Sequence, residues 1–186
     1  MKLKSKWPVR RFFTFLGALY LFCAVTPLLL AESGTAKSES VFRIYDTATE
    51  TIRTVNDLDF LCGALPCEMA VSAPDEALRA QIIAIHTLYD RKRRENTGKD
   101  FDFTCDSAEK SIYTVDAGLT DEEQNRVRAL CLSVLDKEIY FENEPINACY
   151  FAISAGCTQP FENVWPEKSY PYLTAVACPS DLLAQG

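Results

Sequence analysis

The stretch that decides the fold is Cys67–Tyr89, "CEMAVSAPDEALRAQIIAIHTLY". Its second half predicts a long helix, because Pro74 suits a first helical turn and Asp75 and Glu76 complement the positive end of the helix dipole. An apolar stripe then recurs at helical spacing, at Leu78, Ile82, Ile85 and Tyr89. The first half holds one acid, Glu68, among small and apolar residues. Whether this glutamate does chemistry is the question that the rest of the sequence must answer.

The residues before this stretch predict a hairpin and a shorter helix. Residues 41–55, "VFRIYDTATETIRTV", contain two β-prone runs around a Thr-rich turn. Helical spacing follows, because Thr54 and Asp57 have the spacing of a capping box and Leu58, Leu61 and Leu65 share an apolar face. Pro66 is expected to end or kink this helix, because proline lacks the backbone N–H that a helix interior needs.

The residues after it add further strands and one more helix. Residues 101–115 are expected to be extended, with strand at both ends, and Thr120 with Glu123 predicts a second capping box that opens a helix. Residues 138–154 predict two strands about the turn "ENEP", and residues 171–178 a last short strand. Hairpins and helices without a βαβ rhythm indicate an α+β fold over residues 41–186, packed as one mixed domain.

The N-terminus predicts a membrane anchor. Residues 1–11 carry five Lys and Arg and no acid, and residues 12–30 carry no charge. A helix of that length rises roughly 28 Å, close to the thickness of the hydrocarbon layer. Basic residues before the span place the N-terminus in the cytoplasm and the C-terminal domain outside the cell membrane. Residues 1–31 are therefore expected to be a cytoplasmic tail and single-pass signal-anchor, and residues 32–40 a linker, with a cleaved signal peptide as the alternative.

The charge balance argues against nucleic acid as a partner. Apart from the five basic residues at the N-terminus, the chain has 14 Lys and Arg against 26 Asp and Glu, a net charge of −12. Such a surface repels polyanions. It is compatible with a sugar chain.

Seven of the eight cysteines lie in the outer part of the chain. An extracytoplasmic location permits disulfides, but the odd number and the absence of a Cys-x-x-Cys spacing leave the pairing open. Buried free thiols are the alternative. The sequence has one histidine, His86, which excludes zinc sites built on several histidines. It also has no Gly-rich phosphate loop, so no nucleotide or flavin cofactor is predicted. No metal is predicted, because nothing in the spacing calls for a Cys/His zinc site, which stays open as the alternative.

The remaining chemical candidates are carboxylates. Asp75, Glu76 and Asp121 to Glu123 are explained by helix starts. Glu68 has no such role, and its apolar neighbours predict a desolvated carboxyl, the environment in which a general acid keeps its proton near neutral pH. From composition alone, a partly exposed loop glutamate remains the alternative.

Four motifs in order resemble the stage II sporulation protein D family. The first is "CEMAVSAPDEALRAQIIAIHTLY", similar to the family's Glu-Met signature that precedes Glu-Ala-Leu-Lys-Ala-Gln and Arg-Thr-Tyr. The others are "FTCDSAEKSIYT", the Ser-Gly-Gly-x-Thr-like "SAGCT", and "VW" followed by "PYL". Together they cover roughly residues 41–181, and four motifs in the right order are far more specific than one.

The resemblance implies a membrane-anchored lytic transglycosylase that acts on peptidoglycan during sporulation engulfment. Such an enzyme cleaves the bond between MurNAc and GlcNAc and leaves a 1,6-anhydro end. Glu68 matches the family's catalytic glutamate. Substrate-binding roles are expected at positions that fall on the family's turn, at aromatic residues and at the family's arginine position: Ser154, Gly156, Thr158, Tyr150, Trp165, Tyr172 and His86. For each aromatic residue core packing is the alternative, and for His86 a structural role.

The sequence departs from the family pattern at several positions. Ala155 replaces the first turn glycine, His86 replaces an arginine, and Cys105 stands alone where some members carry a zinc segment. The family usually continues beyond the position of Gly186, which indicates a shortened member or a fragment. Two other functions therefore stay open: a glycan-binding or scaffolding protein without catalysis, and an enhancer of a cell-wall amidase. Other cell-wall hydrolases of the engulfment machinery are the expected protein partners.

Overall fold

The computed structural model describes residue 13, residues 40–109 and residues 111–183. The chain from Val41 onward forms one compact unit. The predicted anchor at residues 12–30 and the linker at residues 32–40 lie outside the described residues, except for Phe13 and Ser40. Of the helices that are described, none is long and apolar enough to cross a bilayer.

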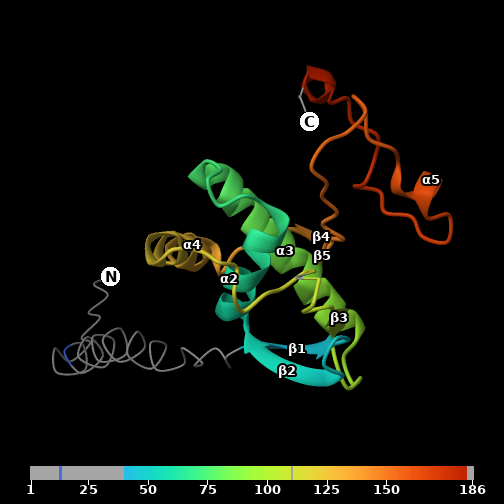
Figure 1. Cartoon of the computed structure of the whole chain (residues 1–186). Helices are drawn as coiled ribbons and strands as arrows, with labels where there is room; N and C mark the ends of the chain where they lie inside the picture. The colour runs from blue at the N-terminus through green and yellow to red at the C-terminus, as the bar shows by residue number, and fades with distance from the viewer. Residues whose placement is uncertain (1–12, 14–39, 110, 184–186) are drawn as a thin grey trace, which may run out of the picture. The chain divides into compact units, whose positions relative to one another are not determined.

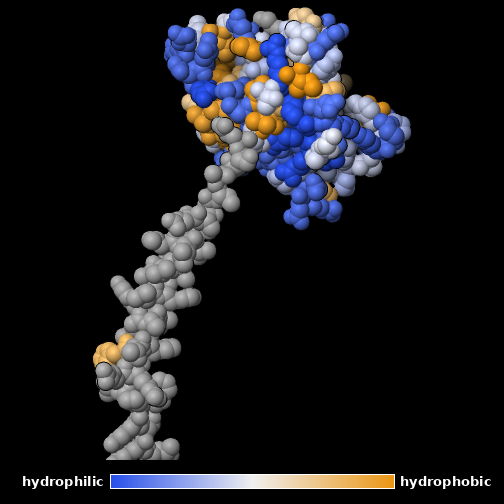
Figure 2. Space-filling model, turned by 90° about the horizontal axis from the view of Figure 1, so that it is seen from below, coloured by the Kyte–Doolittle hydropathy of each residue, from blue (hydrophilic) through white to orange (hydrophobic). Residues whose placement is uncertain are grey.

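The predicted hairpin at the start of the domain is confirmed. Strands β1 (Val41–Asp46) and β2 (Thr51–Asn56) pair antiparallel, and β3 (Phe103–Cys105) joins β1 in parallel, which gives the order β2-β1-β3. Alternate β1 residues are buried, and most of β2 is exposed. The face seen in Figure 2 is accordingly mostly hydrophilic, with hydrophobic residues in small groups.

Helices α2 (Asp57–Glu68) and α3 (Asp75–Glu95) pack against the sheet, and α4 (Asp121–Val134) packs on these two helices (Figure 1). The capping box at the start of α4 is confirmed, since the Thr120 side chain accepts the Glu123 N–H and Glu123 accepts the Thr120 N–H. The capping box predicted at Thr54 is wrong. Asn56 caps α2 instead and accepts the Asp59 N–H at 2.8 Å, because β2 continues through Thr54.

Pro66 lies inside α2 and does not end the helix at its own position. The helix runs two residues further, to Glu68, and closes where the Met69 N–H donates to the Leu65 carbonyl at 3.0 Å. A proline so close to a helix end removes one backbone hydrogen bond and leaves the preceding turns intact. The consequence is that Glu68 belongs to a helix and not to a loop.

Aromatic rings join the helices to the sheet in the core. Phe60 of α2 contacts Phe42 of β1 and Tyr89 of α3, with ring centroids 4.7 and 5.0 Å apart. Tyr89 also contacts Phe103 of β3 at 4.5 Å. Apolar residues of α2, α3 and α4 complete the core: Leu61, Leu65, Leu78, Ile82, Ile85, Val127, Leu130 and Val134. The mixed α+β packing predicted from the sequence is thus present in the described residues.

The described residues after α4 contain little regular structure. Strands β4 (Tyr140–Phe141) and β5 (Glu144–Pro145) form a two-residue ladder, followed by α5 (Phe161–Val164) and the 3-10 helix η1 (Pro179–Leu183). The turn lies at Glu142 and Asn143, both with left-handed φ, and does not extend over "ENEP" as predicted. The strand predicted at residues 171–178 is wrong: the described residues there form an isolated bridge between Cys157 and Ala177 and are mostly exposed.

Candidate active site

Glu68 is the last residue of α2, and its side chain is exposed. The prediction of a carboxyl walled off by apolar groups is therefore wrong, because Glu68 is exposed at the end of the helix. The connection from Met69 to α3 is held from α4. Arg126 donates from its guanidinium to the carbonyls of Val71 and Ala73, the latter at 2.9 Å, and pairs with Asp75. The end of α2, the start of α3 and the side chain of Arg126 therefore fix the backbone that follows Glu68.

Tyr150, a residue of the C-terminal region, lies near Glu68. Its side chain packs against the core. Burial, followed by the charge of Glu68 and hydrogen bonding to Glu68, raises the pKa of the Tyr150 phenol. The phenol therefore stays protonated and offers its O–H to the Glu68 carboxylate.

The charge of Glu68 also acts on two residues of α3. Burial, followed by the charge of Glu68, raises the pKa of the Tyr89 phenol. The amino group of Lys92 lies 4.6 Å from the centre of the Tyr89 ring. Burial lowers the pKa of Lys92, against the charges of Glu95, Cys149 and Glu68. Glu68, Tyr89, Lys92 and Tyr150 are called the Glu68 cluster below.

Sequence reasoning missed the α3 members of this cluster. Tyr89 and Lys92 are three residues apart and so share one side of the helix. Tyr89 is part of the apolar stripe predicted for α3, and Lys92 is in the charged run that closes the helix. Nothing in that spacing says which of these residues faces Glu68.

A groove of about 530 Å³ begins at Tyr150 and runs through the C-terminal region. Its size is typical of a small-molecule or oligomer site. Its walls are largely apolar and aromatic, from Tyr150, Phe151, Ile153, Phe161, Val164, Trp165, Tyr172, Leu173 and Val176, and it is called the aromatic groove below. Five of the seven residues predicted to bind substrate line it: Tyr150, Ser154, Thr158, Trp165 and Tyr172.

The turn at residues 154–158 supports the groove wall. The Ser154 N–H and hydroxyl both donate to Asp181 Oδ2, at 2.9 and 2.6 Å, and these bonds lower the pKa of Asp181. Gly156 has a left-handed φ of 89° and packs against Leu182, so a larger residue would not fit. The Thr158 hydroxyl accepts the Val176 N–H at 2.8 Å. Gly156 shapes the turn and is not among the residues that line the groove.

The aromatic residues of the groove differ in exposure. Trp165 is 48% exposed and stacks on Phe161 with ring centroids 4.5 Å apart. Tyr172 accepts the Asn147 N–H at 2.9 Å through its hydroxyl and contacts Phe141. Trp165 therefore presents an open face to a ligand, whereas Tyr172 joins the groove to the β4–β5 ladder.

The residues that carry Glu68 match a known family. The model of the stage II sporulation protein family, SpoIID, matches residues 45–133. These residues, just under half of the chain, are similar to the SpoIID family. The resemblance seen in the sequence is thereby confirmed, and the SpoIID domain contains Glu68, Tyr89 and Lys92, while Tyr150 and the aromatic groove follow it in the chain.

Two curated relatives extend the similarity past the SpoIID domain. Stage II sporulation protein D of Bacillus subtilis (strain 168) is 25% identical over 148 residues, which are 74% of this chain and 43% of that protein. Stage II sporulation protein D of Bacillus amyloliquefaciens is 26% identical over 161 residues, 81% of this chain and 46% of that protein. The chain spans less than half the length of these relatives.

His86, at the family's arginine position, lies inside the SpoIID domain and not in the groove. It is 2% exposed, and its Nε2 lies 3.5 Å from Asp57 Oδ2 and 3.7 Å from Glu138 Oε1. Its surroundings are those of the structural alternative raised from the sequence. In the described parts of the chain, no three His, Cys, Asp or Glu side chains come together as metal ligands would.

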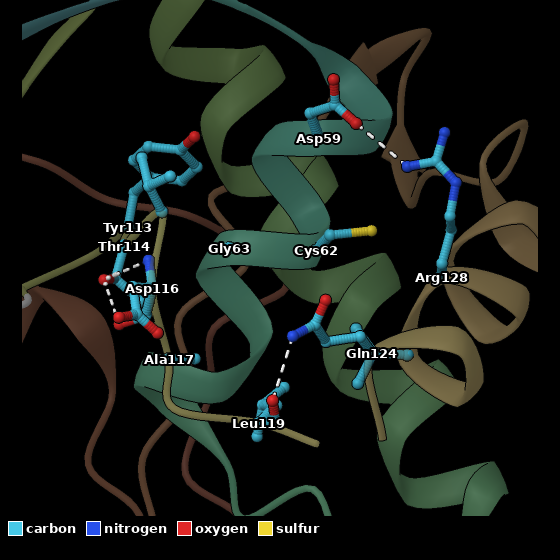
Figure 3. Close-up of a pocket in the computed structure, with 12 residues that line it drawn as sticks. Asp59, Cys62, Gly63, Tyr113, Thr114, Asp116, Ala117, Leu119, Gln124 and Arg128 are labelled. Carbon is cyan, nitrogen blue, oxygen red and sulfur yellow. Dashed lines mark hydrogen bonds and ion pairs between the residues drawn. The ribbon is translucent and has the colours of Figure 1, made fainter. Parts of the chain in front are cut away.

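A second pocket, of about 370 Å³, lies between α2 and α4 (Figure 3). Residues 113–117 form one wall, and Arg128 of α4 pairs with Asp59 of α2 at 3.1 Å on the other. Cys62 also lines this pocket. It contains none of the site residues predicted from the sequence.

Proposed function

We propose that this chain is a lytic transglycosylase that cleaves the MurNAc-GlcNAc bond of peptidoglycan, with Glu68 as its acid and base. The observation that carries the proposal is the Tyr150–Glu68 contact, because Tyr150 also lines the aromatic groove. In this proposal a glycan strand bound in the groove reaches the family's glutamate past Tyr150. Similarity to the SpoIID family supports a role in sporulation.

One carboxylate is enough for this reaction. Ordinary glycosidases need two, an acid and a nucleophile or base. In a lytic transglycosylase the 6-hydroxyl of the muramic sugar replaces water: it attacks C1 of its own ring as the bond from C1 to the glycosidic oxygen breaks. Glu68 donates a proton to that leaving oxygen, and the resulting carboxylate accepts the proton of the 6-hydroxyl. No atom enters from solvent, and Glu68 ends the reaction in the protonation state in which it began, because it donates one proton and accepts another.

The Glu68 cluster suits both halves of this exchange. The Tyr150 hydroxyl donates to the carboxylate and so holds its orientation. Lys92 lies on the same side of α3 as Tyr89, with its amino group 4.6 Å from the centre of the Tyr89 ring, and adds a cation to the cluster. Glu68 reaches solvent, so a glycan strand can approach it without movement of the core.

The aromatic groove supplies the sugar contacts in this proposal. Pyranose rings present apolar faces that stack on aromatic side chains, and the open face of Trp165 offers such a surface. The negative charge of the domain does not oppose this binding, because the glycan backbone is held by stacking of its sugar rings on aromatic side chains. The Ser154 and Thr158 hydroxyls act indirectly, since both are engaged in holding the turn.

The cellular setting is part of the same proposal. Residues 12–30 anchor the chain in the cell membrane as a single pass, with residues 1–11 in the cytoplasm and the domain outside. Peptidoglycan glycan strands are the substrate during engulfment, and other cell-wall hydrolases of that process are its partners. Labelling of an introduced N-terminal cysteine by a membrane-impermeant reagent, with the labelled residue located by peptide mass, tests the orientation. Labelling of that residue in intact cells contradicts it, whereas labelling of the exposed Cys149 and Cys157 of the domain is expected.

The decisive experiment compares full-length protein with Glu68→Gln on purified sacculi. Wild type should release muropeptides with 1,6-anhydro ends, identified by mass, and Glu68→Gln should release at least about 100-fold less, the scale of positioned proton transfer. Glu122→Gln, which changes an exposed glutamate at the start of α4, is the matched control and should keep full activity. Equal release by wild type and Glu68→Gln excludes the proposal.

A glycan-binding role without catalysis is the second candidate. The exposure of Glu68 favours it, because an exposed carboxyl lacks the desolvation that helps a general acid keep its proton. In that case wild type and Glu68→Gln bind glycan strands equally and neither releases anhydro ends. Stimulation of a cell-wall amidase by the added protein would indicate the enhancer role instead.

A further inference from the structure

Two thiols meet where α2 packs on α4. Cys131 of α4 is fully buried, and its thiol hydrogen-bonds to the sulfur of Cys62 on α2. The Asp59–Arg128 ion pair, at 3.1 Å, lies three residues earlier on each helix. Residues three apart share a helix face. The ion pair therefore sets the register that brings Cys62 opposite Cys131.

The two thiols differ in access and in acidity. Cys62 lines the pocket between α2 and α4, and Figure 3 shows its sulfur on the side of Arg128. The hydrogen bond from Cys131, and then the charge of Arg128, lower the pKa of Cys62 against the effect of burial. The hydrogen bond to Cys62 and burial raise the pKa of Cys131. Cys62 is thus the thiol that ionises first and that a reagent can reach.

We propose that Cys62 and Cys131 form a disulfide by exchange with a disulfide oxidant, with Cys62 as the attacking and Cys131 as the resolving thiol. The oxidant is a small or protein disulfide that reaches Cys62 through the pocket. This inference goes beyond the proposed function and does not depend on it.

The exchange balances in two steps. The Cys62 thiolate attacks one sulfur of the oxidant, the oxidant's S–S bond breaks, and one thiolate leaves with its electron pair. Cys131 then loses its proton to solvent and attacks Cys62 Sγ, which breaks the mixed disulfide and releases the second thiolate. Two protein thiols are oxidised and one disulfide is reduced to two thiols. The bond links α2, which ends at Glu68, to α4, which holds the following connection through Arg126.

The test uses reduced full-length protein exposed to oxidised glutathione, followed by alkylation of the remaining thiols. We expect a mass loss of two hydrogens and a peptide linkage between the segments that contain Cys62 and Cys131. Because Cys67 lies in the same tryptic segment as Cys62, Cys67→Ser is the matched control and should keep the linkage. Cys62→Ser should lose it.

Two further readouts separate the roles of the thiols. Cys131→Ala should accumulate one glutathione on Cys62, since no resolving thiol remains. Oxidation should raise the Tm of wild type by several degrees, because a closed loop restricts the unfolded chain, and should leave the Tm of Cys62→Ser unchanged. Persistence of the linkage in Cys62→Ser, or its absence from fully oxidised wild type, overturns the proposal. These two outcomes are measured on wild type and Cys62→Ser alone. The proposal can therefore be rejected even if Cys131→Ala does not fold.

Discussion

The hydroxyl of Tyr150 connects the two parts of the candidate site. It belongs to a side chain that packs against the core, lines the aromatic groove and hydrogen-bonds to Glu68. An exposed carboxylate at a helix end has several rotamers available, and a fixed donor selects one of them. The residue therefore converts a mobile acid into a positioned one.

Removal of this hydroxyl tests its positioning role. Tyr150→Phe keeps the ring in the groove and deletes the hydrogen bond to Glu68. A hydrogen bond to a charged group is worth about 1.5–3 kcal/mol, so we expect kcat on peptidoglycan to fall about 10- to 100-fold with KM little changed. A rise in KM alone would show that Tyr150 acts only as a groove wall.

Asp46 at the end of β1 provides a separate prediction about stability and pH. Hydrogen bonds from the Ser107 side chain, and then from the backbone N–H groups of Ser107 and Ala48, hold its pKa at about 2, below its value of about 3.8 in an unfolded chain. Because the folded-state pKa is depressed, the stabilisation is fully present above about pH 4 and is lost as the pH falls toward 2.

The comparison is between wild type and Asp46→Asn in urea unfolding at a series of pH values. Asp46→Asn should be less stable at pH 7 and should lose less of its stability between pH 4 and pH 2. Asp100→Asn, at an exposed position, is the control and should follow wild type. Parallel curves for wild type and Asp46→Asn would contradict the assignment.

At the scale of residues, the sequence identifies Glu68 but not its environment. Its motif position singles it out, yet its exposure depends on where α2 ends, and a proline two residues earlier suggested an earlier end. The Ser154 turn could be predicted from its motif. Its partner Asp181 could not, because a contact across 27 residues of irregular chain leaves no periodic signal.

At the scale of elements, α2 is held on opposite sides by different neighbours. Cys62 faces α4, and the next residue, Gly63, lies against the Tyr113 ring and the Thr114 carbonyl. The Thr114 N–H also donates to the Gly63 carbonyl at 3.2 Å. A glycine in the middle of a helix costs about 0.5–1 kcal/mol relative to alanine, so its presence indicates a packing requirement.

Gly63→Ala should therefore destabilise the domain in spite of its better helix propensity. The new Cβ would lie 2.4 Å from the Thr114 carbonyl oxygen and 2.5 Å from the Tyr113 ring, both too close. Overpacking of this kind costs about 1–3 kcal/mol, which exceeds the gain in propensity. Urea unfolding measures the net change, which we expect to be a loss of about 1–2 kcal/mol. A gain in stability would show that residues 113–114 move away freely.

The elements that could be predicted are those with strong local signals. The capping box of α4 and the apolar stripe of α3 fix those helices within a few residues. The C-terminal strands could not be placed, because their β-prone residues are exposed and held by contacts with distant parts of the chain. Arg91 of α3, for example, donates to the Pro145 carbonyl at 2.8 Å and lies over the Tyr170 ring.

At the scale of the whole molecule, catalysis and binding are assigned to different stretches of chain. Glu68 lies in the SpoIID domain, and the aromatic groove lies after residue 133. Contacts from Tyr150 and Arg91 join the two. Changes in the groove away from Tyr150 should therefore affect glycan binding without changing the chemistry at Glu68.

Trp165→Ala tests this division. It removes the open stacking face of the groove while leaving Glu68 and Tyr150 in place. Loss of one aromatic–ring contact is worth about 0.5–1.5 kcal/mol beyond the area buried, so KM for glycan strands should rise about 3- to 10-fold with kcat nearly unchanged. Leu132→Ala, which truncates an exposed apolar residue on α4, is the control. An unchanged KM would remove Trp165 from the binding site.

The hydrogen bonds and the ion pair from Arg126 to the connection between α2 and α3 have a consequence for sequence variation. Its guanidinium holds the carbonyls of Val71 and Ala73 and the carboxylate of Asp75 at once. An inserted or deleted residue at positions 69–74 would move at least one of these three acceptors out of reach of a side chain anchored on α4. The length of that connection and the identity of residue 126 should therefore change together during evolution. A relative that has lost the arginine is where a longer or shorter connection is to be expected.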